Sequence, residues 1–266
     1  MKAYIAAAVQ MSSTGDLDAN LDQAQSLISE AVKKGAELVA LPENFSFLGP
    51  EKEKVARAAE IGERSKSFLL EQAREQAILL SGGTFVAPAA EGKTWNRAVL
   101  AGPAGPLAVY DKIHLFDVDL PTESLRESDT VAAGDQVVVS PTDGLGTLGL
   151  SICYDLRFPE LYRLLAEQGA EVLMIPAAFT KFTGAKHWSL LVRARAVENT
   201  CFAIAPNQCG NHFGSRFSYG HSLIVDPWGE VLAEAGDTPE VITATLDSDA
   251  LADIRRRIPS LRHRRL

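Results

Sequence analysis

Cys153 is the residue of this sequence best placed for covalent chemistry. It follows residues 147–152, whose alternating small and apolar side chains predict a strand, and it precedes Phe158-Pro159-Glu160, which is typical of a helix start. A turn between a strand and a helix can expose a thiol and direct N–H groups toward it, which lowers the thiol pKa. Cys153 is therefore a candidate nucleophile. The alternative, a small buried apolar residue, suits Cys201 and Cys209 better.

Two charged residues border apolar segments elsewhere in the chain. Glu43 directly follows the apolar run LVALP, where a carboxylate costs free energy unless it has partners or a function. Lys112 lies in the segment VYDKIHLFD at 109–117, in which His114 is a base that could pair with a cysteine. The structural alternatives are a helix-capping or surface position for Glu43 and a solvated position for Lys112. A Cys–His pair stays open at this point.

An internal repeat indicates how these residues are positioned. Three segments recur in the same order: GAELVALPENF at 35–45 as GAEVLMIPAAF at 169–179, FVAP at 85–88 as AIAP at 203–206, and NRAVLAGPAGPLAV at 96–109 as GHSLIVDPWGEVLA at 220–233. Glu43 has an alanine, Ala177, at its counterpart position. The carboxylate therefore belongs to one half of the repeat only.

The repeat predicts two α/β halves. Apolar residues at helical spacing predict a helix over 17–34, with Asp16 as its N-cap and Gly35 as its stop. Further helices are predicted over 65–77, 158–168 and 185–199, and hairpins at Gly105 and Gly229. Each half would form a sheet with helices on one face, and the sister sheet would cover the other face. We predict a four-layer α–β–β–α sandwich in one domain, residues 1–266, with a doubly wound single sheet as the alternative.

Composition narrows the classes of function. The 266 residues carry a net charge of -8, which argues against nucleic-acid binding, and no apolar run is long enough to cross a membrane. The first ten residues, MKAYIAAAVQ, predict a buried strand of a cytoplasmic protein rather than a signal peptide. Three cysteines without a CxxC pair argue against a disulfide framework and a zinc site. The basic C-terminal tail, about 258–266, is expected to lie on a dimer partner or on the protein's own acidic surface.

Three motifs in order resemble one enzyme superfamily. LPENF, YDKIHLFD and SICYDLRFPELYR resemble the Glu, Lys and Cys motifs of the nitrilase (carbon–nitrogen hydrolase) superfamily, and the resemblance extends to about residue 257. It implies the α–β–β–α fold predicted above and a homodimer, or a larger homo-oligomer, that associates through its helices. It also implies hydrolysis of an amide with no metal and no organic cofactor.

The resemblance also implies roles for single residues. Glu43 matches the general base, Lys112 the lysine that stabilises the oxyanion, and Cys153 the nucleophile that forms a thioester. The segment around Glu127 resembles the one that supplies a second glutamate, with Asp119 and Glu123 as competitors. On this interpretation the backbone N–H of Tyr154 shares the oxyanion with Lys112, and His114 has a structural role.

Within the superfamily the chain most resembles the Nit branch. Residues 205–229 resemble amidases that hydrolyse deaminated glutathione to alpha-ketoglutarate and cysteinylglycine, whereas 112–121 equally resemble omega-amidases, which act on alpha-ketoglutaramate. A non-catalytic binding module of the same fold is a third hypothesis. An anionic substrate needs donors near the motifs. The candidates that we predict to bind it are Tyr154, Arg157, Phe179, Thr180 and His187.

Overall fold

The computed structural model describes residues 1–119 and 124–265. Its first sheet contains β1 (Tyr4–Gln10), β2 (Leu38–Ala40), β3 (Leu79–Ser81), β4 (Phe85–Pro88), β5 (Thr94–Gly102), β6 (Gly105–Asp111) and β17 (Glu240–Leu246). Its second sheet contains β9 (Val139–Thr142), β10 (Gly146–Leu150), β11 (Val172–Met174), β12 (Phe202–Ala205), β15 (Leu223–Val225) and β16 (Val231–Glu234). Two hairpins stand apart from the sheets: β7 (Asp117–Asp119) with β8 (Ser124–Arg126), and β13 (Cys209–Phe213) with β14 (Arg216–Tyr219).

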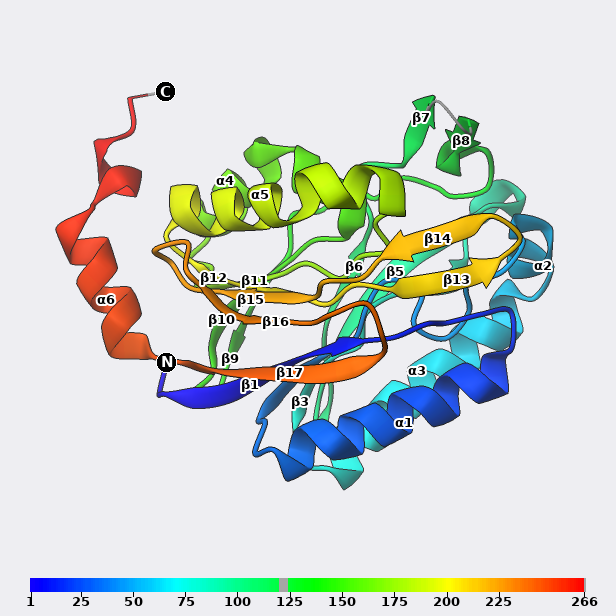
Figure 1. The fold of residues 1–266 in the computed structure, drawn as a ribbon, viewed down its shortest axis with the longest axis horizontal. Helices are drawn as coiled ribbons and strands as arrows, with labels where there is room; N and C mark the ends of the chain where they lie inside the picture. Colours follow the sequence, from blue (N-terminus) through cyan, green and yellow to red (C-terminus); the bar gives the residue numbers. More distant parts are fainter. Residues whose placement is uncertain (120–123, 266) are drawn as a thin grey trace.

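Helices cover the outer faces of the two sheets. The α-helices are α1 (Leu17–Lys33), α2 (Glu51–Ala56), α3 (Ala58–Glu75), α4 (Pro159–Glu167), α5 (Lys181–Asn199) and α6 (Ser248–Arg257). Short 3-10 turns are η1 (Ala90–Gly92), η2 (Glu127–Asp129), η3 (Cys153–Arg157) and η4 (Ser260–His263). Figure 1 shows α1 and α3 on one side of the paired sheets and α4 and α5 on the other. The predicted α–β–β–α sandwich is confirmed.

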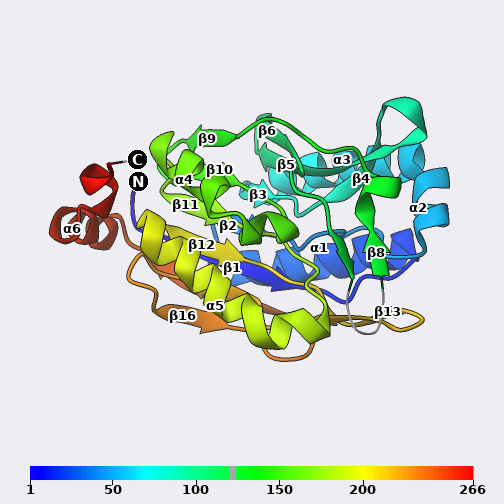
Figure 2. The same cartoon turned by 90° about the horizontal axis from the view of Figure 1, so that it is seen from above.

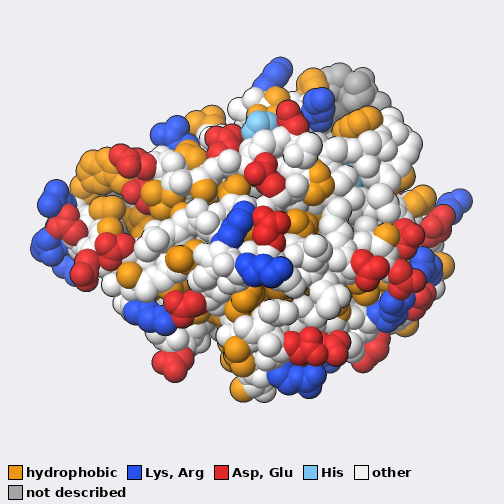
Figure 3. Space-filling model, turned by 60° about the horizontal axis from the view of Figure 1, so that its bottom comes forward, with side chains coloured by type: hydrophobic (Ala, Val, Ile, Leu, Met, Phe, Trp, Pro, Cys, Tyr) orange, Lys and Arg blue, Asp and Glu red, His pale blue; other side chains and the backbone are white. Residues whose placement is uncertain are grey.

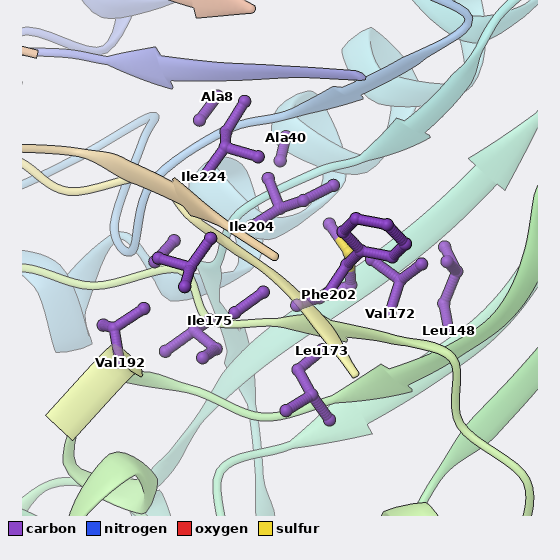
Figure 4. Close-up of a cluster of buried hydrophobic side chains, with 14 of the residues drawn as sticks. Ala8, Ala40, Leu148, Val172, Leu173, Ile175, Val192, Phe202, Ile204 and Ile224 are labelled. Atoms are coloured by element: carbon purple, nitrogen blue, oxygen red, sulfur yellow. The ribbon is translucent and has the colours of Figure 1, made fainter. Parts of the chain in front are cut away.

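The interface between the sheets follows from strand alternation. In β1, Ala6 and Ala8 face the second sheet, whereas Ala7 and Val9 face the outer helices. Figure 4 shows Ala8 and Ala40 on the side of Ile204 and Ile224, and all four are fully buried. Alanine on the first sheet leaves room for branched side chains on the second. Burial of each such isoleucine contributes about 1.5–3 kcal/mol.

The predicted helix ends agree with the structure at the first helix and differ at two others. The Asp16 side chain accepts from the Ala19 amide at 3.1 Å, and Gly35 turns the chain with φ +86° after α1 ends. The helix predicted from 185 begins at Lys181, because Thr180 supplies the N-cap. The helix predicted from 65 begins at Ala58, directly after α2.

The repeat is visible in the sheet topology, with one correction. Strands β1, β2 and β3 are parallel neighbours, as are β10, β11 and β12, and each half ends in a hairpin, β5–β6 or β15–β16. The match of FVAP with AIAP is wrong: β12 occupies the place of β3, and β4 is an additional edge strand paired with β5. Short apolar strands that end in Ala-Pro look alike in sequence wherever they lie in the sheet.

The C-terminal segment completes the first sheet with one strand and then packs against the second half of the repeat. Strand β17 pairs antiparallel with β1 along its whole length. Arg255 of α6 then donates to the carbonyls of Thr200 at 3.0 Å and Ala170 at 2.8 Å, and Arg264 forms an ion pair with Glu167 of α4. Figure 2 shows the resulting position of α6 at the end of the molecule where both termini lie. The basic tail therefore contacts the protein's own surface.

The surface charges and the helices bear on the kinds of surface that the protein could bind. On the face shown in Figure 3, acidic and basic side chains are interspersed rather than gathered by sign. No helix in the described part of the chain is long and apolar enough to cross a membrane.

Candidate active site

Glu43, Lys112 and Cys153 come from three chain segments that meet beside one cavity of about 440 Å³. Glu43 follows β2, Lys112 follows β6, and Cys153 opens η3 after β10. Cys153 has φ +47°, in the left-handed region, and its amide donates to the Pro176 carbonyl at 2.9 Å. That backbone conformation is uncommon for a residue with a side chain, so the fold holds the thiol in place at some cost.

Lys112 is enclosed by two carboxylates. Its ammonium lies 2.9 Å from Glu43 Oε1 and 2.8 Å from Glu127 Oε2, and its side chain is 2% exposed. The buried amide of Asn96 donates to both carboxylates, at 2.9 Å to Glu43 and 3.2 Å to Glu127. Sequence reasoning missed Asn96. Its position in the repeat, opposite Gly220 at the start of a hairpin, was the available signal.

The second oxygen of Glu43 is held by the other half of the repeat. The amide of Ala178 donates to Glu43 Oε2 at 2.9 Å. Ala178 directly follows Ala177, the repeat counterpart of Glu43, so equivalent strand ends of the two sheets meet at this point. Each half therefore contributes to the position of the carboxylate.

Glu127 lies in this cluster and Asp119 does not. Besides Lys112, the amide of Phe116 donates to Glu127 Oε2 at 2.6 Å. Asp119 is exposed and pairs with Arg126, and Glu123 lies outside the described residues. The charge of Glu127 is thus matched by one buried ammonium, the side-chain amide of Asn96 and one backbone amide.

Burial and the neighbouring charges shift the pKa values of the ion-paired groups in opposite directions. Burial alone would lower the pKa of Lys112, but the carboxylates of Glu127 and Glu43 outweigh it and raise that pKa well above its ordinary value. Burial likewise would raise the pKa of Glu127, but Lys112 holds it below the ordinary value. Lys112 is therefore an ammonium and Glu127 a carboxylate at neutral pH.

The pKa of the Cys153 thiol moves opposite to the direction expected from the sequence. Burial raises it well above the usual range, and the carboxylate of Glu43 raises it further, while Lys112 acts in the other direction. The lowered pKa was predicted from the N–H groups of the turn, which do not offset the loss of solvation in a closed site. The resting side chain is a protonated thiol, so its chemistry requires a base.

A buried carboxylate that the sequence reasoning missed holds the Cys153 turn against the Lys112 segment. Asp155 accepts from the Tyr110 hydroxyl at 2.7 Å and the Ile152 amide at 2.8 Å. It also contacts His114, at 3.0 Å through the backbone amide and 2.7 Å through Nδ1. His114 is thus paired with Asp155, which does not support a Cys–His pair.

Four of the five predicted substrate-binding residues line the cavity. Tyr154, Phe179 and Thr180 are in its wall, and Arg157 lies over the rings of Tyr154 and Phe179, at 5.7 and 5.4 Å from their centres. His187 is not among the residues of the cavity wall. Its ring lies behind Arg157, with Nδ1 3.4 Å from both terminal guanidinium nitrogens. Thr180 caps α5 and His187 lies about two helical turns further along it, which places the imidazole beyond the cavity wall.

Among the residues that the structure describes, no group of three or more His, Cys, Asp or Glu side chains could hold a metal ion.

Known proteins similar to this chain point to one family. The profile of the carbon-nitrogen hydrolase family matches residues 5–256. The chain is 50% identical to a deaminated glutathione amidase of Synechocystis sp., over 99% of both chains, and 42% identical to omega-amidase NIT2 of Xenopus tropicalis, over 92% of this chain and 89% of the other. Among solved structures, C. elegans NitFhit superimposes with a TM-score of 0.94 at 37% identity, covering 100% of this chain and 66% of that one. With the fold and motifs described above, these matches show that the chain belongs to the carbon-nitrogen hydrolase family of the nitrilase superfamily.

Proposed function

We propose that this carbon–nitrogen hydrolase is an amidase that cleaves a small anionic amide through a thioester on Cys153. The observation that carries the proposal is the joint burial of Cys153, Glu43 and Lys112 beside one cavity. A protonated thiol, a carboxylate and an ammonium are the three groups that thiol-dependent acyl transfer requires.

In the first half of the reaction, Glu43 takes the thiol proton as sulfur attacks the amide carbonyl. The C–S bond forms and the carbonyl π electrons move onto oxygen. Lys112 and the Tyr154 N–H stabilise this oxyanion, since the amide of Cys153 is already bonded to Pro176. When the tetrahedral intermediate collapses, the C–N bond breaks and Glu43 returns the proton to the leaving nitrogen.

In the second half, water hydrolyses the thioester. Glu43 takes a proton from water as oxygen attacks the same carbonyl carbon, and the C–S bond breaks as the sulfur is reprotonated. Glu127 and Asn96 hold Lys112 and Glu43 in place through both halves. Because Lys112 has two carboxylate partners, it stays charged whichever protonation state Glu43 adopts.

The cavity wall favours an anionic substrate. Five cationic side chains among the described residues line it, against three carboxylates, in a chain of net charge -8: Lys54, Lys112, Arg126, Arg157 and Arg216 against Glu43, Glu51 and Glu127. No carboxylate of a described residue lies within ion-pair distance of Arg157. We propose that Arg157 binds a substrate carboxylate, with Tyr154, Phe179 and Thr180 shaping the site.

Deaminated glutathione is the proposed substrate, hydrolysed to alpha-ketoglutarate and cysteinylglycine. The higher identity to the Synechocystis amidase than to the Xenopus omega-amidase supports it. Alpha-ketoglutaramate is the second candidate, since an omega-amidase is also a close relative and the two substrates share one acyl group.

Mass spectrometry of the acid product tests the proposal. Purified wild type and Cys153→Ala are given both amides at equal concentration. We expect at least tenfold preference for deaminated glutathione, about 1.4 kcal/mol in transition-state free energy, and no turnover by the variant. Preference for alpha-ketoglutaramate would select the second candidate. Turnover that survives Cys153→Ala would overturn the mechanism, and no turnover by wild type would favour a binding module.

We further propose that the chain forms a homodimer or larger homo-oligomer through α5. The outer face of this helix exposes Leu190 at 67% and Val197 at 47%. Arg193, on the same face, donates to the Gly229 carbonyl at 2.8 Å, which brings the half-exposed Trp228 beside them. Contiguous exposed apolar side chains of this kind support association. The cytoplasmic location stays a prediction.

A further inference from the structure

Lys54 is a buried cation of the cavity wall for which the mechanism above has no use. It is 8% exposed, while Glu51, Lys52 and Glu53 of the same short helix, α2, are exposed. Its ammonium contacts Glu51 Oε1 at 2.7 Å. The other oxygen of Glu51 accepts from the Thr130 hydroxyl at 3.2 Å. A lysine turned inward from an otherwise exposed helix needs a physical reason, because burial of an ammonium is costly.

The position of Lys54 differs from that of Arg157. Helix α2 lies at the end of the molecule that also holds β8 and the β13–β14 hairpin, as Figures 1 and 2 both show. Arg157 belongs to η3, in the second half of the chain, and is held between two aromatic rings. Among the cations of the cavity wall, Lys54 and Arg157 thus come from different halves of the chain, which makes them candidates for two different carboxylates.

The charge of Lys54 acts on Glu127, which borders the same cavity. Burial raises the pKa of Glu127, but Lys112 lowers it, and the charge of Lys54 adds a smaller effect in the same direction. Lys54 and Glu127 both line the cavity, and Glu127 in turn contacts Lys112.

The carboxylate that now pairs with Lys54 can be exchanged. The side chain of Glu51 is 55% exposed, whereas that of Lys54 is 9% exposed. Glu51 can therefore turn to water at little cost, while Lys54 cannot leave the wall without exposing its own buried surroundings. A substrate carboxylate that enters the cavity would replace Glu51 on the same ammonium, and this exchange keeps the buried charge paired.

We propose that Lys54 binds a carboxylate on the leaving-group side of the scissile bond, while Arg157 binds the carboxylate of the acyl group. The substrate class is then a dianionic amide whose leaving amine itself carries a carboxylate, as a small peptide does. This inference rests on the proposed function and adds the basis of its selectivity. Lys54 separates such amides from primary amides, whose leaving group is ammonia.

The first test compares two substrates that share an acyl group. For Lys54→Met, we expect the ratio of kcat/KM for deaminated glutathione to that for alpha-ketoglutaramate to fall at least tenfold, mainly through KM for deaminated glutathione. Lys52→Met, on the exposed side of the same helix, is the matched control and should keep the wild-type ratio. Glu51→Gln should lower KM for deaminated glutathione, because it removes the competing carboxylate. Arg157→Gln should lower kcat/KM for both amides.

The second test separates this inference from the proposed chemistry. Binding of deaminated glutathione is measured by calorimetry on Cys153→Ala and on Cys153→Ala with Lys54→Met, both checked for an unchanged thermal midpoint. A rise in Kd of tenfold or more in the double variant supports the site even if wild type proves inactive. An unchanged Kd, or an equal loss of kcat/KM on both amides, would overturn it and leave the amidase proposal standing. Lys54→Gln replaces Lys54→Met if the latter does not fold.

Discussion

At the scale of the residue, Cys153 is controlled by two neighbours of opposite charge. Burial has the largest effect on the thiol pKa and raises it. The carboxylate of Glu43 raises this pKa further, and the ammonium of Lys112 lowers it. The same two groups touch each other at 2.9 Å, so a change in one alters the environment of the other. Substitution of Glu43 or Lys112 should therefore change kcat and the rate of Cys153 alkylation in different ways.

Glu43→Gln should separate the two properties. Loss of the base should lower kcat about 10²–10⁴-fold, whereas loss of the negative charge should lower the Cys153 pKa and make iodoacetamide alkylation faster at pH 8. Lys112→Met should slow alkylation, because it removes the charge that favours the thiolate. Alkylation of Cys153 is followed by mass spectrometry, with Cys201 and Cys209 as buried internal controls. Slower alkylation of Glu43→Gln would contradict the assigned electrostatics.

At the scale of the element, Asp155 joins the turn η3 to β6 and the segment after it. Its carboxylate is fully buried and takes hydrogen bonds from Tyr110, Ile152 and His114. The elements that carry Cys153 and Lys112 are thereby fixed relative to each other. Geometry in the site depends on this carboxylate, although it lines no part of the cavity.

Asp155→Ala should destabilise the protein by about 3 kcal/mol, because several buried donors lose a charged acceptor. Tyr110→Phe removes a single hydrogen bond to the same carboxylate and should cost about 1 kcal/mol. Urea unfolding followed by circular dichroism measures both. Equal effects of the two substitutions would show that the remaining donors of the network find other partners.

The β13–β14 hairpin is attached to the loop after β1 through His212. Its Nδ1 lies 2.7 Å from the Ser13 carbonyl and its Nε2 2.8 Å from the Ser218 hydroxyl, so the buried ring is neutral, with Nδ1 as donor. Burial lowers the pKa of His212 to about 4. Protonation would reverse the hydrogen bond with Ser218 and place a positive charge in a buried site near Arg216.

The free energy of unfolding should decrease as the pH falls, because the unfolded state binds a proton on His212 more readily than the folded state does. Below its ordinary pKa of 6.5 the unfolded state takes up a proton that the folded state accepts only near pH 4. The unfolding free energy should therefore decrease by about 1.4 kcal/mol per pH unit as pH falls through this window, or about 3 kcal/mol in total. The difference between wild type and His212→Gln, measured by urea unfolding at several pH values, isolates this contribution. A difference that does not vary between pH 7 and pH 4 would refute the assignment.

At the scale of the whole molecule, β17 links the two ends of the chain. Its pairing with β1 closes the first sheet with residues that follow the second. We therefore propose that residues 1–266 unfold as a single domain, as the sequence predicts. The exposed side of α5 is the surface that we propose for association.

Leu190→Asp and Trp228→Asp should each shift the protein toward monomer, because a carboxylate on this face opposes its burial. Light scattering after size-exclusion chromatography measures the mass. Phe217→Asp, at another half-exposed apolar side chain on β14, is the control and should leave the mass unchanged. An oligomer that persists in both α5-face variants would place the interface elsewhere.

Local patterns in the sequence were sufficient to predict much of the fold and of the candidate site. Apolar periodicity and capping predicted α1, and the repeat predicted paired halves and the four layers. The repeat failed at FVAP, because four residues cannot specify which place a strand takes in a sheet. The motifs pointed to Glu43, Lys112, Cys153 and Glu127, which the fold brings together. These features depend on residues that are neighbours in the chain, or on motifs that resemble those of the nitrilase superfamily.

Only the tertiary structure decided the state of the site. Asn96 and Asp155 became visible as partners of the catalytic cluster, His187 proved to lie behind Arg157, and Lys54 proved to be buried. The direction of the Cys153 pKa was likewise set by burial and by a glutamate 110 positions earlier in the chain. Desolvation and Coulomb interactions depend on distance in space. A sequence pattern specifies which charges exist, but folding determines which of them meet and how much water remains between them.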